Sequence, residues 1–194
     1  MTLLSATGNR NVCAQQVKVP HAQPIKFIEN KSQWPEQVHF KGEFQGNSVY
    51  LEPTAFTFDL VDSRDLMEAR HAHLSPNEPT PPVPEIHRHA YRMQFIDANE
   101  QVQFATGNKS KEYYSYLLGN DPSKWGHQAY AYNDVTYQSL YQGIDIKVYT
   151  SGENMKYDFI VKPGAKVEDI QIQYDGLIEV IAADGNLYLV TSID

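Results

Sequence analysis

Four histidines flank a proline-rich segment and have the spacing best suited to metal binding. His71 and His73 stand two positions apart before this segment, and His87 and His89 stand two positions apart after it. On a β-strand, side chains at i and i+2 share a face, so each pair could chelate zinc. The spacing fixes no carboxylate partner, and neutral imidazoles are easily accommodated at a surface. We therefore favour four solvated histidines, and we predict neither a metal ion nor another cofactor.

Three carboxylates could support hydrolysis of a glycosidic bond, which needs two such groups across a cleft. These are Glu29, Asp145 and Asp158. Asp145 and Asp158 alternate with apolar residues, so ion pairs with Lys147 or Lys156 on the polar side of a sheet are the simpler interpretation. The sequence also lacks the G-x-S-x-G, P-loop, G-x-G-x-x-G, H-E-x-x-H and EF-hand patterns. We therefore predict no catalytic residues, and a hydrolase or metal-dependent enzyme is the least favoured function.

Tryptophan and tyrosine side chains offer a third kind of chemistry, which is stacking against sugar rings. The candidates for an aromatic platform are Trp34, Trp125, Tyr130 and Tyr132. Trp34 precedes a proline, and Trp125 closes a short helical turn expected over 121–125, so both are also placed like residues that lie under a loop. A structural role is the simpler interpretation, and glycan binding is the alternative.

Composition and charge exclude several classes of protein. The 194 residues carry a formal net charge of −8, with acidic and basic residues interspersed. Without a basic stripe, a nucleic-acid partner is not expected. No apolar run approaches the ~20 residues that a membrane-spanning helix needs, so we predict no transmembrane segment. The single cysteine, Cys13, excludes a disulfide framework and a cysteine-ligated zinc site.

Alternating apolar and polar residues predict antiparallel strands that lie half-buried on a core. The apolar members of these runs are Phe56, Phe58 and Leu60; Ile144, Ile146 and Val148; Met155, Tyr157, Phe159 and Val161; Ile170, Ile172 and Tyr174; and Leu187 and Leu189. Turn signals such as Gly46-Asn47 and Asp184-Gly185-Asn186 separate the runs. The pattern predicts an all-β fold, an antiparallel β-sandwich for which a jelly roll is left open, with short helices over 62–71 and 121–125.

The chain divides into a leader, a linker and one domain. Residues 1–16 end in small residues that suit signal peptidase but lack an apolar core, so we expect a signal-peptide remnant or a disordered leader. Residues 17–26 form a linker, and 27–194 form a single β-sandwich domain. Residues 75–85 contain five prolines, which predicts a loop inside this domain because proline cannot donate to a β-ladder. The domain is expected to be truncated at its C-terminus, since 187–194 ends in or just after a strand.

Several segments, in this order, resemble a known domain. They are 27–34 (FIENKSQW), 89–95 (HAYRMQF), 116–125 (YLLGNDPSKW), 140–145 (LYQGID) and 156–165 (KYDFIVKPGA). Over 27–194 the chain resembles an N-terminal domain of unknown function found in large secreted or cell-surface proteins of Bacteroidetes. The domain opens with the form F-x-E-N-K-G-Q-W, and Ser32 stands here at its glycine. Such proteins often carry SBBP β-propeller repeats and a gliding-motility-associated or type IX secretion C-terminal signal, so the resemblance implies export and cell-surface context.

The sequence therefore predicts a non-catalytic N-terminal module of an exported cell-surface protein, secreted or held at the outer surface, with a role in adhesion, assembly or structure. Its expected partners are surface glycans or other cell-envelope proteins. A carbohydrate-binding module is the alternative, and it requires Trp34 or Trp125 to be exposed and coplanar with neighbouring tyrosines. An enzyme would require the carboxylates or the histidines to converge in one cleft.

Overall fold

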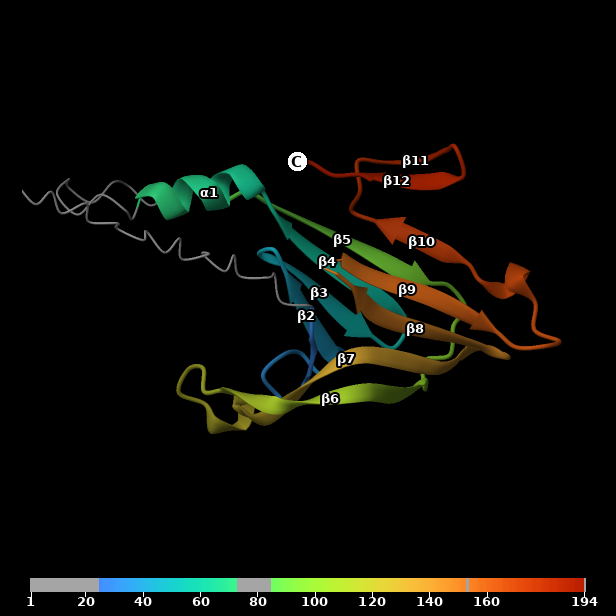
Figure 1. Cartoon of the computed structure of the whole chain (residues 1–194), viewed down its shortest axis with the longest axis horizontal. Helices are drawn as coiled ribbons and strands as arrows, with labels where there is room; N and C mark the ends of the chain where they lie inside the picture. Colours follow the sequence, from blue (N-terminus) through green and yellow to red (C-terminus); the bar gives the residue numbers. More distant parts are fainter. Residues whose placement is uncertain (1–24, 73–84, 153, 194) are drawn as a thin grey trace, which may run out of the picture.

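The structure is a computed structural model that describes residues 25–72, 85–152 and 154–193. It confirms the all-β prediction (Figure 1). The strands are β1 (Phe27–Glu29), β2 (Phe40–Phe44), β3 (Asn47–Glu52), β4 (Ala55–Val61), β5 (Arg88–Phe95), β6 (Gln103–Tyr116), β7 (Gly126–Tyr141), β8 (Ile144–Ser151), β9 (Asn154–Val161), β10 (Ile172–Asp175), β11 (Glu179–Ala183) and β12 (Asn186–Val190). Helix α1 (Ser63–Ala72) and the 3₁₀ turn η1 (Pro122–Lys124) confirm the two predicted helices, and a second 3₁₀ turn is η2 (Val167–Asp169). The predicted leader and most of the proline-rich loop lie outside the described residues.

Ten of the described strands form one sheet that curls into two layers (Figure 1). One layer has the order β10-β5-β4-β3-β2-β1, and the other has the order β9-β8-β7-β6. All pairings are antiparallel, and almost every neighbour in space is also a neighbour in sequence. The layers are therefore two meanders, and not the jelly roll that the strand pattern had left open.

Strand β7 belongs to the second layer and joins it to the first. It pairs with β6 along one edge, whereas its other edge pairs first with β1, at Ala131 and Tyr132, and then with β8, from Asp134 onward. Both layers leave β7 at this same edge and then stack on each other. The core therefore contacts one face of β7 beside β1 and the opposite face beside β8. Accordingly Tyr132 reaches the core from one face of β7, and Val135 and the residues that alternate with it reach the core from the other.

Aromatic rings from both layers fill the core. Phe56 of β4 is fully buried, and its ring centroid lies 5.1 Å from that of Phe95, 5.7 Å from that of Tyr137 and 6.0 Å from that of Tyr157. Phe95 also meets Phe159 of β9 across the layers. All four pairs meet edge to face, which is a favourable geometry for aromatic rings. The inward faces predicted for β4, β8 and β9 are thus confirmed, except at the end of β9, where Val161 is exposed.

Two tight turns confirm the sequence signals for hairpins. The β2–β3 turn has positive φ at both Gln45 (49°) and Gly46 (88°), and the β11–β12 turn has positive φ at both Asp184 (52°) and Gly185 (74°). These are two-residue turns of the type that matches the twist of paired strands. Gly46 has a second role, because a Cβ there would lie only 2.6 Å from Cδ1 of Leu66. The missing side chain lets α1 dock against this turn.

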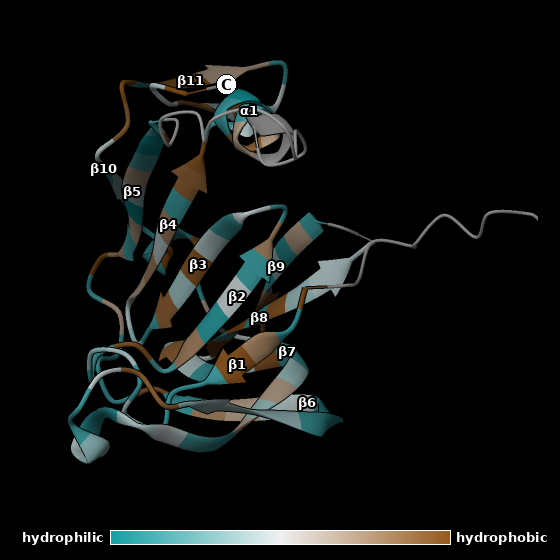
Figure 2. Ribbon diagram, turned by 90° about the vertical axis from the view of Figure 1, so that its left-hand side faces the viewer, coloured by the Kyte–Doolittle hydropathy of each residue, from teal (hydrophilic) through white to brown (hydrophobic). Residues whose placement is uncertain are grey.

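The β11–β12 hairpin departs from the predicted pattern. Within the part of the chain that the structure describes, its strands pair only with each other. Leu187 is 50 % exposed, so the prediction that the last run packs on the core is wrong. The chain turns away from the sheet at Gly176, where φ is +91° and a Cβ would lie 2.8 Å from the Ala90 carbonyl oxygen. In both Figure 1 and Figure 2 the hairpin lies beyond the layers, at the end of the molecule away from β6 and β7.

Candidate functional site

Asn30 organises the loop that follows β1. Its Oδ1 accepts hydrogen bonds from the backbone N–H groups of Ser32 (3.0 Å) and Trp34 (3.2 Å). Its Nδ2 donates to the carbonyl oxygens of Trp34 (3.1 Å), Pro35 (3.0 Å) and Val38 (2.7 Å). One amide side chain therefore forms hydrogen bonds with backbone groups along the whole loop. This is the role of a residue that stabilises a turn and not that of a ligand.

Glu29 and Gln33 complete the same loop. The Glu29 carboxylate accepts from the Tyr130 backbone N–H (3.0 Å) and approaches the Tyr132 hydroxyl (3.4 Å). Gln33 donates to the Glu29 carbonyl (2.8 Å) and accepts from the Lys31 N–H (2.6 Å). Burial, and then the Glu29 carboxylate, raise the pKa of Tyr132. The polar residues of the FIENKSQW segment thus hold the loop and anchor it to β7.

Replacing Ser32 with glycine is expected to raise the free energy of unfolding. Ser32 has φ +86°, a left-handed conformation that costs an L-residue about 1–2 kcal/mol. Glycine removes this cost but gains about 0.5–1 kcal/mol of entropy in the unfolded chain, which leaves a net gain of about 0.5–1 kcal/mol. Urea denaturation measures the change. Ser32→Ala is the matched control, because alanine keeps the Cβ and should give no gain; equal effects of the two variants would contradict the explanation.

Trp34 covers the outer face of β1 and β7 beside this loop. It packs on Ile28, Ala129 and Ala131, and its ring centroid lies 5.4 Å from that of Tyr116, with the two planes at 61°. The Lys41 ammonium lies 5.8 Å from the same ring. The indole is half-buried, and both neighbouring groups limit access to it.

The other aromatic candidates lie elsewhere. Tyr130 and Tyr132 share the face of β7 opposite to the two alanines on which Trp34 packs. The Lys109 ammonium lies 3.2 Å from the Tyr130 ring centroid. Trp125 is half-buried and donates from Nε1 to the Gly119 carbonyl oxygen (3.2 Å). The structure therefore brings Tyr130 and Tyr132 together but distributes the four candidates over two faces.

The candidate carboxylates do not share a cleft. Glu29 lies on the inner side of the β1 layer, whereas Asp145 and Asp158 lie on the outer side of the β8 layer. Asp145 accepts from the Ser139 N–H (2.7 Å) and pairs with Lys162 (2.9 Å), not with the lysines expected from the sequence. Burial alone would raise the pKa of Asp145, but these two hydrogen bonds outweigh burial and lower it.

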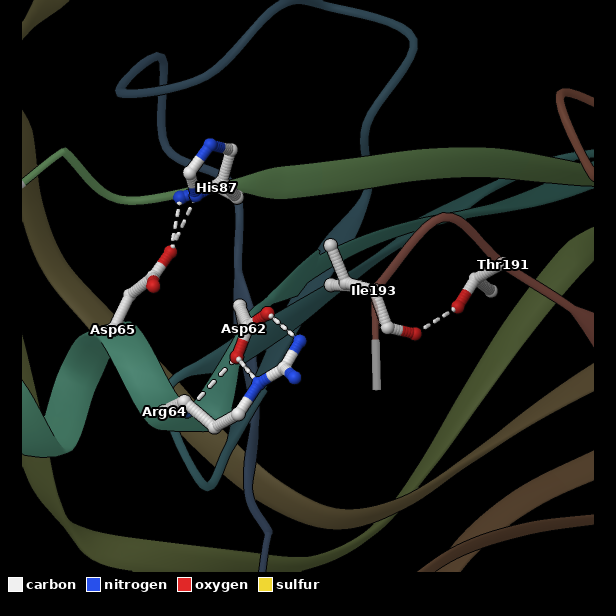
Figure 3. A network of polar contacts seen from close by, with 6 residues as sticks. All are labelled: Asp62, Arg64, Asp65, His87, Thr191 and Ile193. Carbon is white, nitrogen blue, oxygen red and sulfur yellow. Dashed lines mark hydrogen bonds and ion pairs between the residues drawn. The ribbon is translucent and has the colours of Figure 1, made fainter.

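The histidines have separate partners. His87 binds Asp65 through its backbone N–H (2.6 Å) and through Nδ1 (2.9 Å), as Figure 3 shows, and the side-chain hydrogen bond raises the pKa of His87. His89 Nδ1 lies 2.8 Å from the Ser192 hydroxyl. The side chain of His71 and the whole of His73 lie outside what the structure describes. Within the described ranges no three His, Cys, Asp or Glu side chains are grouped to hold a metal ion.

A second ion pair lies beside this histidine, at the start of α1. Asp62 accepts from Nε and Nη2 of Arg64 (3.1 and 2.7 Å) and from its backbone N–H (2.9 Å) (Figure 3). The side-chain hydrogen bond is the main reason why the pKa of Asp62 falls to about 2. A carboxylate held in this way caps a helix and is a poor proton donor.

Comparison with known proteins decides the family. A family model described as a domain of unknown function (DUF7948) matches residues 27–194. The chain belongs to this family. No curated protein and no solved structure matches it. Among the described residues of this DUF7948 domain, no helix is long and apolar enough to cross a membrane.

The sequence did not lead us to expect an exposed apolar group on β6 and the connection that follows it in the DUF7948 domain. Strands β6 and β7 extend into an arm that ends in the connection 117–125 (Figure 1). On this arm Leu118 is 67 % exposed, Leu117 is 56 % exposed and Tyr113 is 54 % exposed. The signal for it was the pair of leucines directly before the Gly-Asn-Asp-Pro turn, where no polar alternation accompanies them. A cluster of this kind on a projecting element is typical of an interaction surface.

One hollow of the described surface has another character. It has a volume of about 610 Å³ and is lined about equally by polar and apolar atoms of the β5–β6 connection, the end of β7 and the β7–β8 connection, with Asp169 and Gln171. The Tyr141 hydroxyl donates to the Gln171 carbonyl oxygen (3.1 Å) at its wall. No candidate residue that the structure describes lines it.

Proposed function

We propose that this domain is a non-catalytic contact module of an exported cell-surface protein, and that the β6–β7 arm makes the contact in adhesion or assembly. The exposure of Leu117, Leu118 and Tyr113 carries this proposal. Apolar side chains that cluster on a projecting element gain free energy when a partner covers them, by roughly 25 cal/mol per Å² buried. The resemblance to N-terminal domains of secreted and cell-surface proteins supports export.

The arm has a defined shape before any partner binds. Asp121 accepts from the Ser123 N–H (3.1 Å) and caps η1, and the Trp125 indole is held by the Gly119 carbonyl. Further down the arm, Lys109 lies over Tyr130. A preordered surface loses little conformational entropy on binding, so more of the contact energy appears as affinity.

The hydrogen bonds of the candidate polar residues support a non-catalytic role. Glu29 and Asn30 have their hydrogen-bonding atoms occupied by the β1–β2 loop and β7, and Asp145 is paired with Lys162. A general acid or base must reach a substrate proton, and groups used in this way to hold backbone are badly placed to do so.

The test is binding of the full chain to envelope fractions from the organism that encodes it, measured by biolayer interferometry. Leu117→Ser combined with Leu118→Ser is expected to weaken binding at least about tenfold, since each change removes more than 1 kcal/mol of apolar burial. Met67→Ser is the matched control, because Met67 is 63 % exposed on α1, away from the arm. Saturable binding that the arm variant leaves unchanged would contradict the proposal.

Exposed tyrosines on the arm favour a second candidate, which is glycan binding. Tyr113 and Tyr114 are both exposed, and Tyr113 meets Tyr130 edge to face at 6.0 Å. A glycan array with the full chain and with Trp125→Ala decides between the candidates. A reproducible hit that the substitution abolishes would favour a carbohydrate-binding module, and an array without hits would favour a protein partner.

A further inference from the structure

The β11–β12 hairpin is a two-stranded sheet with apolar side chains on both faces. The register places Val180, Ala182, Leu187 and Leu189 on one face, and Ile181, Tyr188 and Val190 on the other. Ile181 is 40 % exposed and Tyr188 is 50 % exposed. A hairpin of two strands is only marginally stable in water, whereas three or more strands with apolar faces are stable. The hairpin therefore has the composition of part of a larger sheet.

The free edge of β11 is the accessible one. In both Figure 1 and Figure 2, β11 is the outermost element at its end of the molecule. Its register with β12 is continuous, without a bulge, so the backbone groups of its outer edge stand in regular order. Nothing from the described parts of the chain pairs with that edge.

Natural sheet edges usually carry devices that prevent pairing with another chain. The β6 edge has Lys109 and Lys111 and an irregular register between 109 and 113. The β9 edge has Lys156 and Asp158, one of each sign. β11 has neither lysine, proline nor a bulge, and its only charge is Glu179 at its first position.

We propose that β11 pairs antiparallel with β11 of a second copy of this chain, which creates the four-stranded sheet β12-β11-β11-β12. The two-fold axis passes beside Ile181, so that Ile181 faces its own counterpart. Val180 then faces Ala182, a large side chain against a small one, and Glu179 faces Ala183. No charged residue faces a charged residue in this register.

Charge within β11 does little to oppose a second copy in this register. Each Glu179 stands two positions from the axis, so the two carboxylates are four positions apart along the strands, a separation of about 13 Å. This exceeds the Debye length of about 8 Å at physiological ionic strength, so their repulsion is largely screened. The remaining opposition comes from the net charge of −8 on each chain. Dimerisation is therefore expected to strengthen as salt is added. This pairing does not depend on the contact proposed for the arm.

Sedimentation equilibrium of the full chain, at increasing protein concentration and in low and high NaCl, measures the pairing. A reversible dimer that tightens with salt is expected. Ile181→Lys places two ammonium groups opposite each other and should weaken the dimer at least tenfold. Leu118→Lys is the matched control, because it adds the same charge to an exposed leucine of the arm and should leave the dimer intact.

A charge-swap experiment tests the register itself. Ile181→Lys and Ile181→Glu should each be monomeric alone and should form a heterodimer when mixed, because only a strand that faces its own copy puts these two positions opposite each other. Circular dichroism verifies that both variants are folded. The proposal is overturned if the natural chain stays monomeric at all concentrations, if Ile181→Lys still dimerises, or if the mixture fails to associate.

Discussion

Replacing Phe56 with alanine is expected to lower the free energy of unfolding by about 3–5 kcal/mol, the range for removing a buried phenylalanine. Phe56 is fully buried and contacts rings from β5, β7 and β9, so it joins the two layers. Its removal leaves a cavity that rigid aromatic neighbours cannot fill. Urea denaturation followed by tryptophan fluorescence measures the loss.

Phe58 provides the matched control on the same strand. It is half-buried and stacks on Tyr91 with the ring centroids 4.7 Å apart. Phe58→Ala should cost clearly less than Phe56→Ala, because water can reach part of the space. Equal losses would mean that the two layers do not meet at Phe56 as the structure has them.

Replacing Asn30 with aspartate is expected to cost about 2–4 kcal/mol, although the two side chains have the same shape. The amide nitrogen has two protons, which it shares among three carbonyl oxygens, and a carboxylate oxygen in its place would face these three acceptors without a proton. Each lost bond to a partly buried carbonyl costs about 1 kcal/mol, and the added charge raises the total. Thermal denaturation at neutral pH measures the loss.

The matched control is Asn120→Asp in the exposed end of the arm. It adds the same charge without removing a loop anchor, and it should change stability by less than about 0.5 kcal/mol. The cost of Asn30→Asp should also shrink at acid pH, where protonation restores one donor. A cost of Asn30→Asp no larger than that of the control would contradict the structural role of the loop.

The family motif has a structural role in the β1–β2 loop. The segment FIENKSQW has a glutamate, an asparagine, a lysine and a tryptophan within eight residues, a composition that also suits an active site. In the structure its polar atoms bind the loop backbone and β7, and the indole covers two alanines. The motif residues therefore stabilise the β1–β2 loop, and this role is compatible with the contact module proposed above.

The sequence determined the local features of this protein. The alternation in β4 and β8 predicted which side chains face inward, because in a strand successive side chains point to opposite faces. The signals at Gly46 and Asp184-Gly185 predicted tight turns, because few residues tolerate positive φ. The preference for Asn30 as a loop residue also follows from short-range hydrogen bonding.

Only the tertiary structure decided which elements meet. The same alternation that placed Ile144 in the core also occurs in β12, yet Leu187 is exposed, because the chain leaves the sheet at Gly176. Asp145 pairs with Lys162, directly after β9, and not with Lys147 or Lys156. Trp34 comes from another loop and packs on the face of β7 opposite to Tyr130 and Tyr132. Local periodicity specifies a strand and its two faces, whereas the partner of each face depends on contacts between residues far apart in the chain.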